Sequence, residues 1–259
     1  MTYGLNLYSI RNLIKTEDQF LDTAKKLKEM GYAYMQFSGT AFQPDMIGRV
    51  SRASDLPVVL THVPMARILE DTNALMEEHA RIGCSYIGLG SMPQELLLDS
   101  VKLKETVAAL DDAGARMEKA GFRFFYHHHH FEFFRMEDGE TVFDYILKNA
   151  PHIHITIDTY WLQYGGVDIF DMIDRARGRI ECIHLKDYAI ACKQGERPSF
   201  EPRIAPVGDG NIDFARVIRH AQAAGCQYYL VEQDNAADMP DTLGEVARSA
   251  HYLNTHFAN

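Results

Sequence analysis

The stretch AKKLKEMGYAYMQF (residues 24–37) passes from a helix-like segment through a single glycine into a short apolar run. Four later stretches repeat this order: HARIGCSYIGLG (79–90), ARMEKAGFRFFYH (115–127), RARGRIECIHLK (175–186) and HAQAAGCQYYLVEQ (220–233). Glycine directly after a helix adopts a left-handed conformation at little cost, and the β-branched or aromatic run that follows favours a strand. The repeat therefore predicts five helix-to-strand junctions, at Gly31, Gly83, Gly121, Gly178 and Gly225.

Three further apolar runs, YGLNLYS (3–9), LPVVLTH (56–62) and HIHITID (152–158), bring the number of predicted strands to eight. The eight strands are expected at residues 3–8, 33–38, 57–62, 85–90, 122–127, 153–158, 180–185 and 227–232. The segments between them, such as TEDQFLDTAKKLKEM (16–30), have helical periodicity. Alternating strands and helices indicate a parallel sheet covered by helices, and eight such units in about 250 residues match a closed (β/α)8 TIM barrel.

A doubly wound open sheet is the alternative fold. That fold typically has a Gly-rich phosphate-binding turn after its first strand, and NLYSIRN (6–12) contains no glycine. No linker or low-complexity stretch divides the chain, so we expect one domain over residues 1–259.

The composition excludes several classes of partner. The formal charge is −10 and no cluster of lysine or arginine stands out, which argues against a nucleic acid or an anionic membrane surface as a partner. The four cysteines are far apart in the sequence and form no CxxC pair, a pattern typical of free thiols in a reducing compartment. No segment resembles a signal peptide or a membrane span, so a cytoplasmic location is expected.

Polar side chains gather at the carboxyl ends of the predicted strands, where a TIM barrel holds its active site. In chain order these residues are Asn6, Tyr8, Gln36, His62, His127, His129, Asp158, His184, Lys186, Glu232 and Asp234. Asp158, His184 and Glu232 end three consecutive strands and should converge in space. Taken singly, Asp158 is more simply explained as a helix N-cap and His184 as a buried core histidine.

Together these residues favour a metal site, because two carboxylates and an imidazole suit Mn²⁺, Mg²⁺, Co²⁺ or Zn²⁺. The fourth ligand is expected from the neighbouring strand, which ends in four consecutive histidines, residues 127–130. His127 is the last residue that strand geometry places at the barrel rim, and His129 shares its face because side chains alternate.

The order of short motifs resembles that of the xylose isomerase-like barrels, the sugar phosphate isomerase/epimerase superfamily. The motifs that carry the resemblance are LNLYSIRN (5–12), YHHHHFEF (126–133), DTYWLQYGG (158–166), HLKD (184–187), VGDGNIDF (207–214) and VEQD (231–234). The resemblance implies a divalent metal held by residues of strands five to eight: His127, Asp158, His184 and Glu232. Strand five departs from the family pattern, which has a glutamate where this chain has His127. His129 and Glu132 remain alternatives for that role.

The resemblance also implies that a proton is moved next to a carbonyl of a keto-sugar or polyol through an enediolate. Glu232 is the expected base, His129 a second proton-transfer group, and Lys186 a cation for a substrate oxygen or a partner of an acidic residue. Tyr8, His62 and Trp161 are expected to contact the substrate. The Pro- and Gly-rich segment at residues 193–211 is expected to form a lid, from which Arg203 reaches the substrate.

Three other functions remain open at this stage. A lyase that dehydrates a keto-polyol or splits a keto-glycoside begins with the same proton abstraction. An endonuclease IV-like phosphodiesterase is disfavoured by the acidic charge. A non-catalytic sugar-binding barrel is possible if the altered strand five no longer supports a metal. A phosphorylated substrate is not supported, because no Gly-rich phosphate cradle is present. A homo-oligomer is suggested only by analogy.

Overall fold

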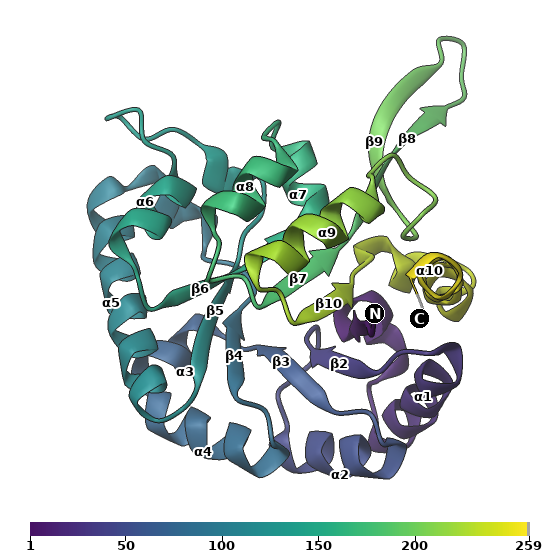
Figure 1. Ribbon diagram of the computed structural model, residues 1–259, viewed down its shortest axis with the longest axis horizontal. Helices are drawn as coiled ribbons and strands as arrows, with labels where there is room; N and C mark the ends of the chain where they lie inside the picture. The colour runs from purple at the N-terminus through teal and green to yellow at the C-terminus, as the bar shows by residue number, and fades with distance from the viewer. Residues whose placement is uncertain (258–259) are drawn as a thin grey trace.

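The computed structural model describes residues 1–257 and contains a closed barrel of eight parallel strands surrounded by helices (Figure 1). Around the barrel the strands follow the order β1-β10-β7-β6-β5-β4-β3-β2. Their bounds are β1 Gly4–Asn6, β2 Tyr34–Phe37, β3 Val58–His62, β4 Tyr86–Leu89, β5 Arg123–His127, β6 Ile153–Asp158, β7 Cys182–Leu185 and β10 Tyr228–Val231. Each strand lies within a predicted range, so the predicted TIM barrel is confirmed.

Helices follow the strands and cover the outside of the barrel. The α-helices are α1 Glu17–Met30, α2 Pro44–Ser54, α3 Met65–Glu70, α4 Thr72–Ile82, α5 Ser100–Lys119, α6 Val142–Asn149, α7 Thr159–Tyr164, α8 Ile169–Arg175, α9 Phe214–Ala224 and α10 Thr242–Phe257. Short 3₁₀ helices lie at η1 Leu7–Leu13, η2 Gln94–Leu98, η3 Phe131–Phe133 and η4 Asp234–Asp238. All five junction glycines have a positive φ, and Gly31, Gly83 and Gly225 are left-handed C-caps.

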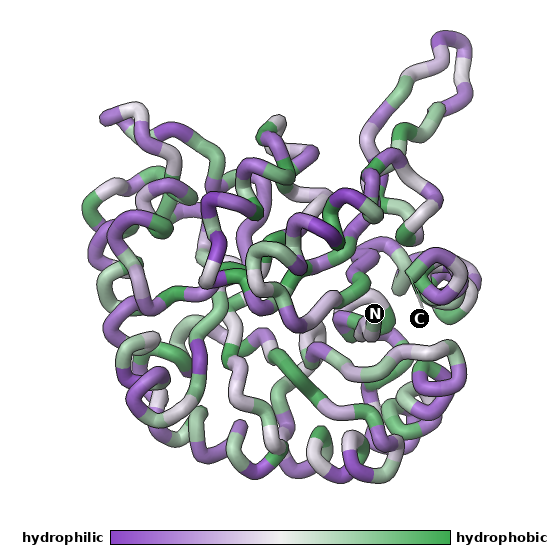
Figure 2. The backbone as a smooth tube through the Cα atoms, in the orientation of Figure 1, coloured by the Kyte–Doolittle hydropathy of each residue, from purple (hydrophilic) through white to green (hydrophobic). Residues whose placement is uncertain are grey.

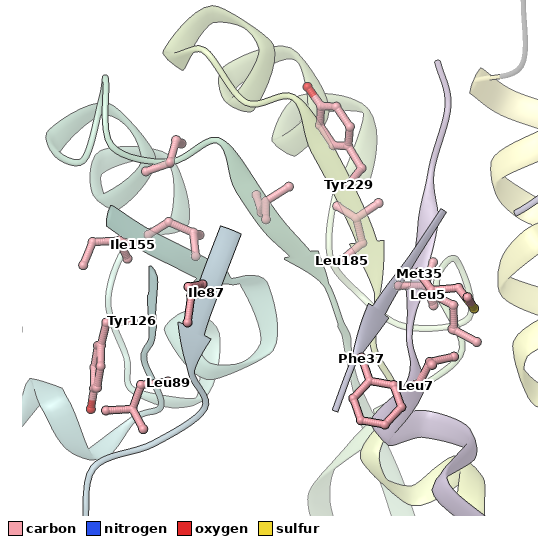
Figure 3. Packing of buried hydrophobic residues seen from close by; sticks show 14 of the residues in the cluster. Leu5, Leu7, Met35, Phe37, Ile87, Leu89, Tyr126, Ile155, Leu185 and Tyr229 are labelled. Carbon is pink, nitrogen blue, oxygen red and sulfur yellow. The ribbon is translucent and has the colours of Figure 1, made fainter. Parts of the chain in front are cut away.

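The main core lies between the strands and the surrounding helices. Outward-facing side chains such as Leu5, Met35, Ile87 and Leu185 are fully buried there (Figure 3). A smaller apolar cluster fills the barrel interior and consists of Tyr34, Leu60, Phe125, Cys182 and Leu230. Along the chain, hydropathy alternates between apolar barrel segments and polar outer helix faces (Figure 2). The interior cluster closes the barrel below the site described next.

The segment after β7 differs from the prediction. Instead of an irregular lid it forms an antiparallel hairpin, β8 Asp187–Lys193 and β9 Ser199–Ala205, which projects beyond the barrel (Figure 1). Prolines at 198, 202 and 206 suggested a loop, but both strands of a two-stranded sheet are edge strands, where proline is tolerated. Across residues 1–257, no helix has the length and apolar character that crossing a membrane requires.

Candidate metal centre

The site is built by strand alternation inside the barrel. Each apolar residue of the interior cluster is followed, two positions later, by a polar residue on the same face. These polar residues are Gln36, His62, His127, His184 and Glu232. The apolar cluster therefore sets the floor and the strand period places the polar layer directly above it.

Four of the predicted residues bring one ligand atom each into a common group. Within residues 1–257, atoms of His127, Asp158, His184 and Glu232 all lie within 4.8 Å of one another, and all four residues are buried. Asp158 and His184 are register partners on β6 and β7, which explains their proximity. His127 Nε2 lies 3.2 Å from Asp158 Oδ2, and His184 Nδ1 lies 2.8 Å from Glu232 Oε2.

The two histidines are each oriented by a hydrogen bond on the ring nitrogen that faces away from the group. His127 Nδ1 donates to the carbonyl of Gly90 at 3.1 Å, and His184 Nε2 donates to Gln36 Oε1 at 2.7 Å. In the neutral imidazole, these bonds leave a lone pair on each opposite nitrogen, which is aimed at the carboxylates. Metal-binding histidines are typically held in this way by an outer hydrogen bond.

Each of the two carboxylates likewise uses one oxygen for an outer hydrogen bond and directs the other oxygen toward the group. Asp158 Oδ1 accepts the backbone N–H of Trp161 at 3.0 Å and so caps helix α7, while Oδ2 faces the group. Glu232 Oε1 accepts a hydrogen bond from Asn6 at 2.6 Å, and its Oε2 faces His184. Asp158 therefore fills both roles considered for it, N-cap and member of the polar group.

This donor set fits a divalent cation. His184 Nδ1 is fully buried and makes no hydrogen bond. Although burial disfavours a charged imidazole, Glu232 and Asp158 raise the pKa of His184 to about 9. The same surroundings that attract a proton attract a metal ion, and two carboxylates balance the charge of a divalent one. Mixed oxygen and nitrogen ligands suit Mn²⁺, Mg²⁺, Co²⁺ or Zn²⁺.

Lys186 is the buried cation of the site, with 1% of its side chain exposed. Its Nζ lies 2.8 Å from Asp234 Oδ1, 3.3 Å from Glu232 Oε2 and 3.6 Å from Asp158 Oδ2. Burial disfavours the ammonium, but Glu232, Asp158 and Asp234 together raise the pKa of Lys186 above its ordinary value. The side chain is therefore charged and held against the polar group. Asp187, by contrast, binds the backbone of the turn at residues 208–212.

A cavity of about 260 Å³ opens above the polar group. It is lined by Tyr8, Ser38, His62, Gly90, Ser91, His127, His129, Lys186, Glu232 and Asp234. Among the residues predicted to contact substrate or move a proton, Tyr8, His62, His129, Lys186 and Glu232 lie on its wall. Trp161 packs behind His129 and beneath Lys186, and Arg203 is exposed on β9 away from the cavity.

The four consecutive histidines have four different surroundings. His127 belongs to the polar group and His129 lines the cavity. His128 is fully buried, and its Nε2 accepts the backbone N–H of Asp158 at 3.0 Å. His130 is only partly buried and stacks on Trp161. The run thus supplies a candidate ligand, a brace for a second ligand, and part of the cavity wall.

Glu132 folds back, as the sequence allowed, but not into the polar group. Its side chain is fully buried, where it accepts hydrogen bonds from the Tyr126 hydroxyl and, at 2.7 Å, from the backbone N–H of His129. Burial raises the pKa of Glu132 to about 7. Glu132 therefore holds the loop that carries His129. The residue that lies beside Asp158 is His127 and not Glu132.

Strand β4 contributes wall residues that sequence reasoning missed. Gly90 and Ser91 follow this strand directly, and Ser38 follows β2. None of them is ionisable, so a search for charged or imidazole groups at strand ends passes over them. Reading the last residue of each predicted strand and the residue after it, whatever its type, would have found all three.

The chain belongs to the xylose isomerase-like TIM barrel family, whose model matches residues 24–255. No curated protein matches this sequence.

Solved structures share the fold at low sequence identity. A sugar phosphate isomerase/epimerase from Parabacteroides distasonis aligns with a TM-score of 0.80 and 22% identity over 99% of both chains. The 3-keto-D-glucoside 4-epimerase of E. coli aligns with a TM-score of 0.68 and 17% identity over 98% of this chain and 99% of that one. A xylose isomerase-like protein from Mycobacterium smegmatis, in complex with magnesium, gives 0.71 and 15% over 99% and 96%.

Proposed function

We propose that this protein is a divalent-metal-dependent sugar isomerase or epimerase that moves a proton next to the carbonyl of a keto-sugar or polyol. The observation that carries the proposal is the convergence of four buried ligand atoms, from His127, Asp158, His184 and Glu232, at the floor of a polar cavity. Membership of the xylose isomerase-like family and the fold shared with two epimerases agree with it.

His127, Asp158, His184 and Glu232 would hold the metal. When bound, a divalent cation polarises a carbonyl oxygen and stabilises the negative charge that develops there. Glu232 is suited to remove the proton, because its Oε2 faces the cavity floor while Asn6 fixes its other oxygen. Burial opposes the charged form, yet Lys186 and His184 lower the pKa of Glu232, so the carboxylate is ionised.

The other wall residues complete the proton transfer. As the C–H bond breaks, its electron pair moves toward the carbonyl oxygen to give an enediolate, and Lys186 supplies a fixed positive charge at that oxygen. His129 is the second proton-transfer group. Burial lowers the pKa of His129 to about 2, so its imidazole is neutral and can offer only its N–H proton. Delivery of this N–H proton to the opposite face of the carbon, while Glu232 keeps the proton that it removed, gives epimerisation.

Substrate hydroxyls are assigned to Tyr8, His62 and Ser38 on the cavity wall. The only lysine or arginine on that wall is Lys186, and three carboxylates already surround it. A phosphate group would therefore find no unpaired lysine or arginine on this wall, which favours an uncharged sugar or glycoside.

The test combines metal analysis with solvent isotope exchange. Purified, untagged protein is expected to contain about one equivalent of divalent metal, and to introduce deuterium from ²H₂O into one member of a panel of uncharged keto-sugars. Glu232→Gln should lose both properties. Glu181→Gln makes the same change at a buried glutamate directly before β7, and this variant should keep both properties.

Other outcomes would redirect the proposal. A product with a new ultraviolet chromophore, formed with loss of water or an aglycone, would identify a lyase on the same site. Protein that binds no metal after Mn²⁺ addition, and exchanges no substrate proton, would contradict the proposal and leave a sugar-binding barrel.

A further inference from the structure

The cavity wall includes Asp234, which belongs neither to the four candidate ligands nor to the proposed proton transfer. Asp234 begins the 3₁₀ helix η4, and both of its neighbours in the chain are anchored. The backbone N–H of Gln233 donates to Ser9 Oγ at 2.9 Å. The side-chain amide of Asn235 donates to the carbonyl of Ile204 at 3.1 Å. The Asp234 carboxylate is therefore carried by a backbone segment that is fixed on both sides.

Asp234 is the nearest of the three carboxylates around the Lys186 ammonium. Lys186 Nζ lies 2.8 Å from Asp234 Oδ1, whereas it lies 3.3 Å from Glu232 Oε2 and 3.6 Å from Asp158 Oδ2. The two farther oxygens are also the ones that face His184 Nδ1 in the candidate metal centre. The ammonium therefore contacts two candidate metal ligands and one carboxylate outside that set.

The Lys186 ammonium cannot be satisfied by solvent, because its side chain is almost completely buried. The ring of Trp161 packs against it, with the ring centroid 4.9 Å from Nζ. An ammonium has three N–H donors, and a buried one needs acceptors for them. Without the Asp234 carboxylate, its remaining ion-pair partners among residues 1–257 would be Glu232 and Asp158. The ammonium would then compete with a metal ion for the same two oxygens.

We propose that Asp234 is a positioning residue that holds Lys186, so that the two ligand carboxylates stay available to a metal ion. The pair of Lys186 with Asp234 is neutral, which leaves the negative charges of Asp158 and Glu232 to balance a divalent cation. In Asp234→Asn, Lys186 would already balance one of these charges, and its ammonium would repel a metal ion at the same oxygens. This inference rests on the proposed function, because it requires a metal at the four candidate ligands.

The experiment measures the dissociation constant of the full chain for Mn²⁺, without substrate, by competition with a metal-sensitive dye. Asp234→Asn should weaken Mn²⁺ binding by about 10-fold, as expected for the loss of a partner behind the ligands. Asp241→Asn makes the same change at an exposed carboxylate directly before α10 and should bind Mn²⁺ as the wild type does. Equal Mn²⁺ affinity in Asp234→Asn and wild type would overturn the inference, and would leave Asp234 to contact substrate directly.

Lys186→Met tests whether Asp234 acts through Lys186. Methionine keeps an unbranched side chain against Trp161 and removes the charge. When Asp234→Asn is added to Lys186→Met, the dissociation constant should change by less than about 2-fold, because no ammonium is left to hold. The same 10-fold loss with and without Lys186 would show that Asp234 acts on the metal by its own charge, and would overturn the inference. Circular dichroism equal to that of the wild type shows that each variant is folded.

A crystal structure of metal-free Asp234→Asn gives a second test, which does not depend on the folding of Lys186→Met. Lys186 Nζ should lie closer to Glu232 Oε2 and Asp158 Oδ2 than it does in metal-free wild type, and an unmoved Nζ would overturn the inference. A wild type that binds no Mn²⁺ would overturn the proposed function and this inference with it. A wild type that binds Mn²⁺ no better than Asp234→Asn does would overturn the inference alone.

Discussion

The two ends of the barrel both bury histidine beside carboxylate, yet the two arrangements differ in what they leave unpaired. At the entrance of the strands, Glu181 Oε2 accepts a hydrogen bond from His154 Nδ1 at 2.7 Å, and its Oε1 is bonded by Arg123. At the opposite end, His184 Nδ1 lies beside Glu232 without any hydrogen bond. Both oxygens of the Glu181 carboxylate are bonded, whereas His184 Nδ1 has no hydrogen-bond partner.

The difference shows that residue type alone does not define a metal site. Asp, Glu and His occur at both ends, but an arginine at the entrance supplies the positive charge that the carboxylate needs. At the other end, Lys186 supplies part of that charge, and outer hydrogen bonds with Gly90, Gln36 and Asn6 leave His184 Nδ1 without a partner. Acceptors left bare in a buried group favour a cation, whereas paired ones stabilise the fold.

The largest expected effect is a difference in activity between the variants of Glu232 and Glu181. Glu232→Gln should lower the rate of substrate proton exchange by about 10³-fold or more, because it removes both a metal ligand and the base. Glu181→Gln should leave the rate near that of the wild type. Deuterium uptake followed by NMR at equal protein concentration measures both. Equal losses of exchange rate in the two variants would contradict the proposal that only the end with Glu232 is catalytic.

The second largest effect is expected when the hydrogen bond that orients His184 is removed. Gln36→Leu removes the acceptor for His184 Nε2–H and should weaken metal binding by about 10–100-fold. Gln36→Glu keeps an oxygen acceptor at that position and should retain most of the affinity. Competition with a metal-sensitive dye gives the dissociation constants. An unchanged affinity in Gln36→Leu would show that His184 does not depend on this hydrogen bond.

At the entrance of the barrel the expected loss is in stability. Glu181→Gln removes the carboxylate that Arg123 and His154 share and should lower the free energy of unfolding by about 1–3 kcal/mol. Urea unfolding followed by circular dichroism measures it. The control is Glu201→Gln, which breaks an exposed ion pair with Lys193 on the β8–β9 hairpin. It should lower the free energy of unfolding by less than about 1 kcal/mol. A Glu181→Gln loss no larger than the control would argue against the network.

The smallest effect is the dependence of that loss on pH. Burial alone disfavours the Glu181 carboxylate, but the hydrogen bond and charge of His154, with Arg123, lower its pKa below the ordinary 4.5. The unfolded chain therefore takes up this proton first as pH falls. The stability difference between wild type and Glu181→Gln should be complete above pH 4.5 and shrink as pH falls through the folded pKa. A difference that grows toward acid would reverse the assigned sign.

Much of the fold and part of the site can be predicted because they depend on local patterns. The junction glycines and apolar runs place all eight strands, and Asp158, His184 and Glu232 stand at strand ends that must meet. The hairpin was missed because prolines suppress the strand signal without preventing an edge strand. The roles of His128 and Glu132 were also beyond sequence reasoning, since both depend on how one loop folds back on β5 and β6.

The sequence by itself determined the barrel, its parallel order and the polar character of one end, because helix caps and strand alternation act over a few residues. Only the tertiary structure decided which nitrogen of each histidine faces inward, that Lys186 meets three carboxylates, and that Glu181 pairs with both Arg123 and His154. These features join residues far apart in the chain. Their energies depend on distance and burial, which exist only after the barrel has closed.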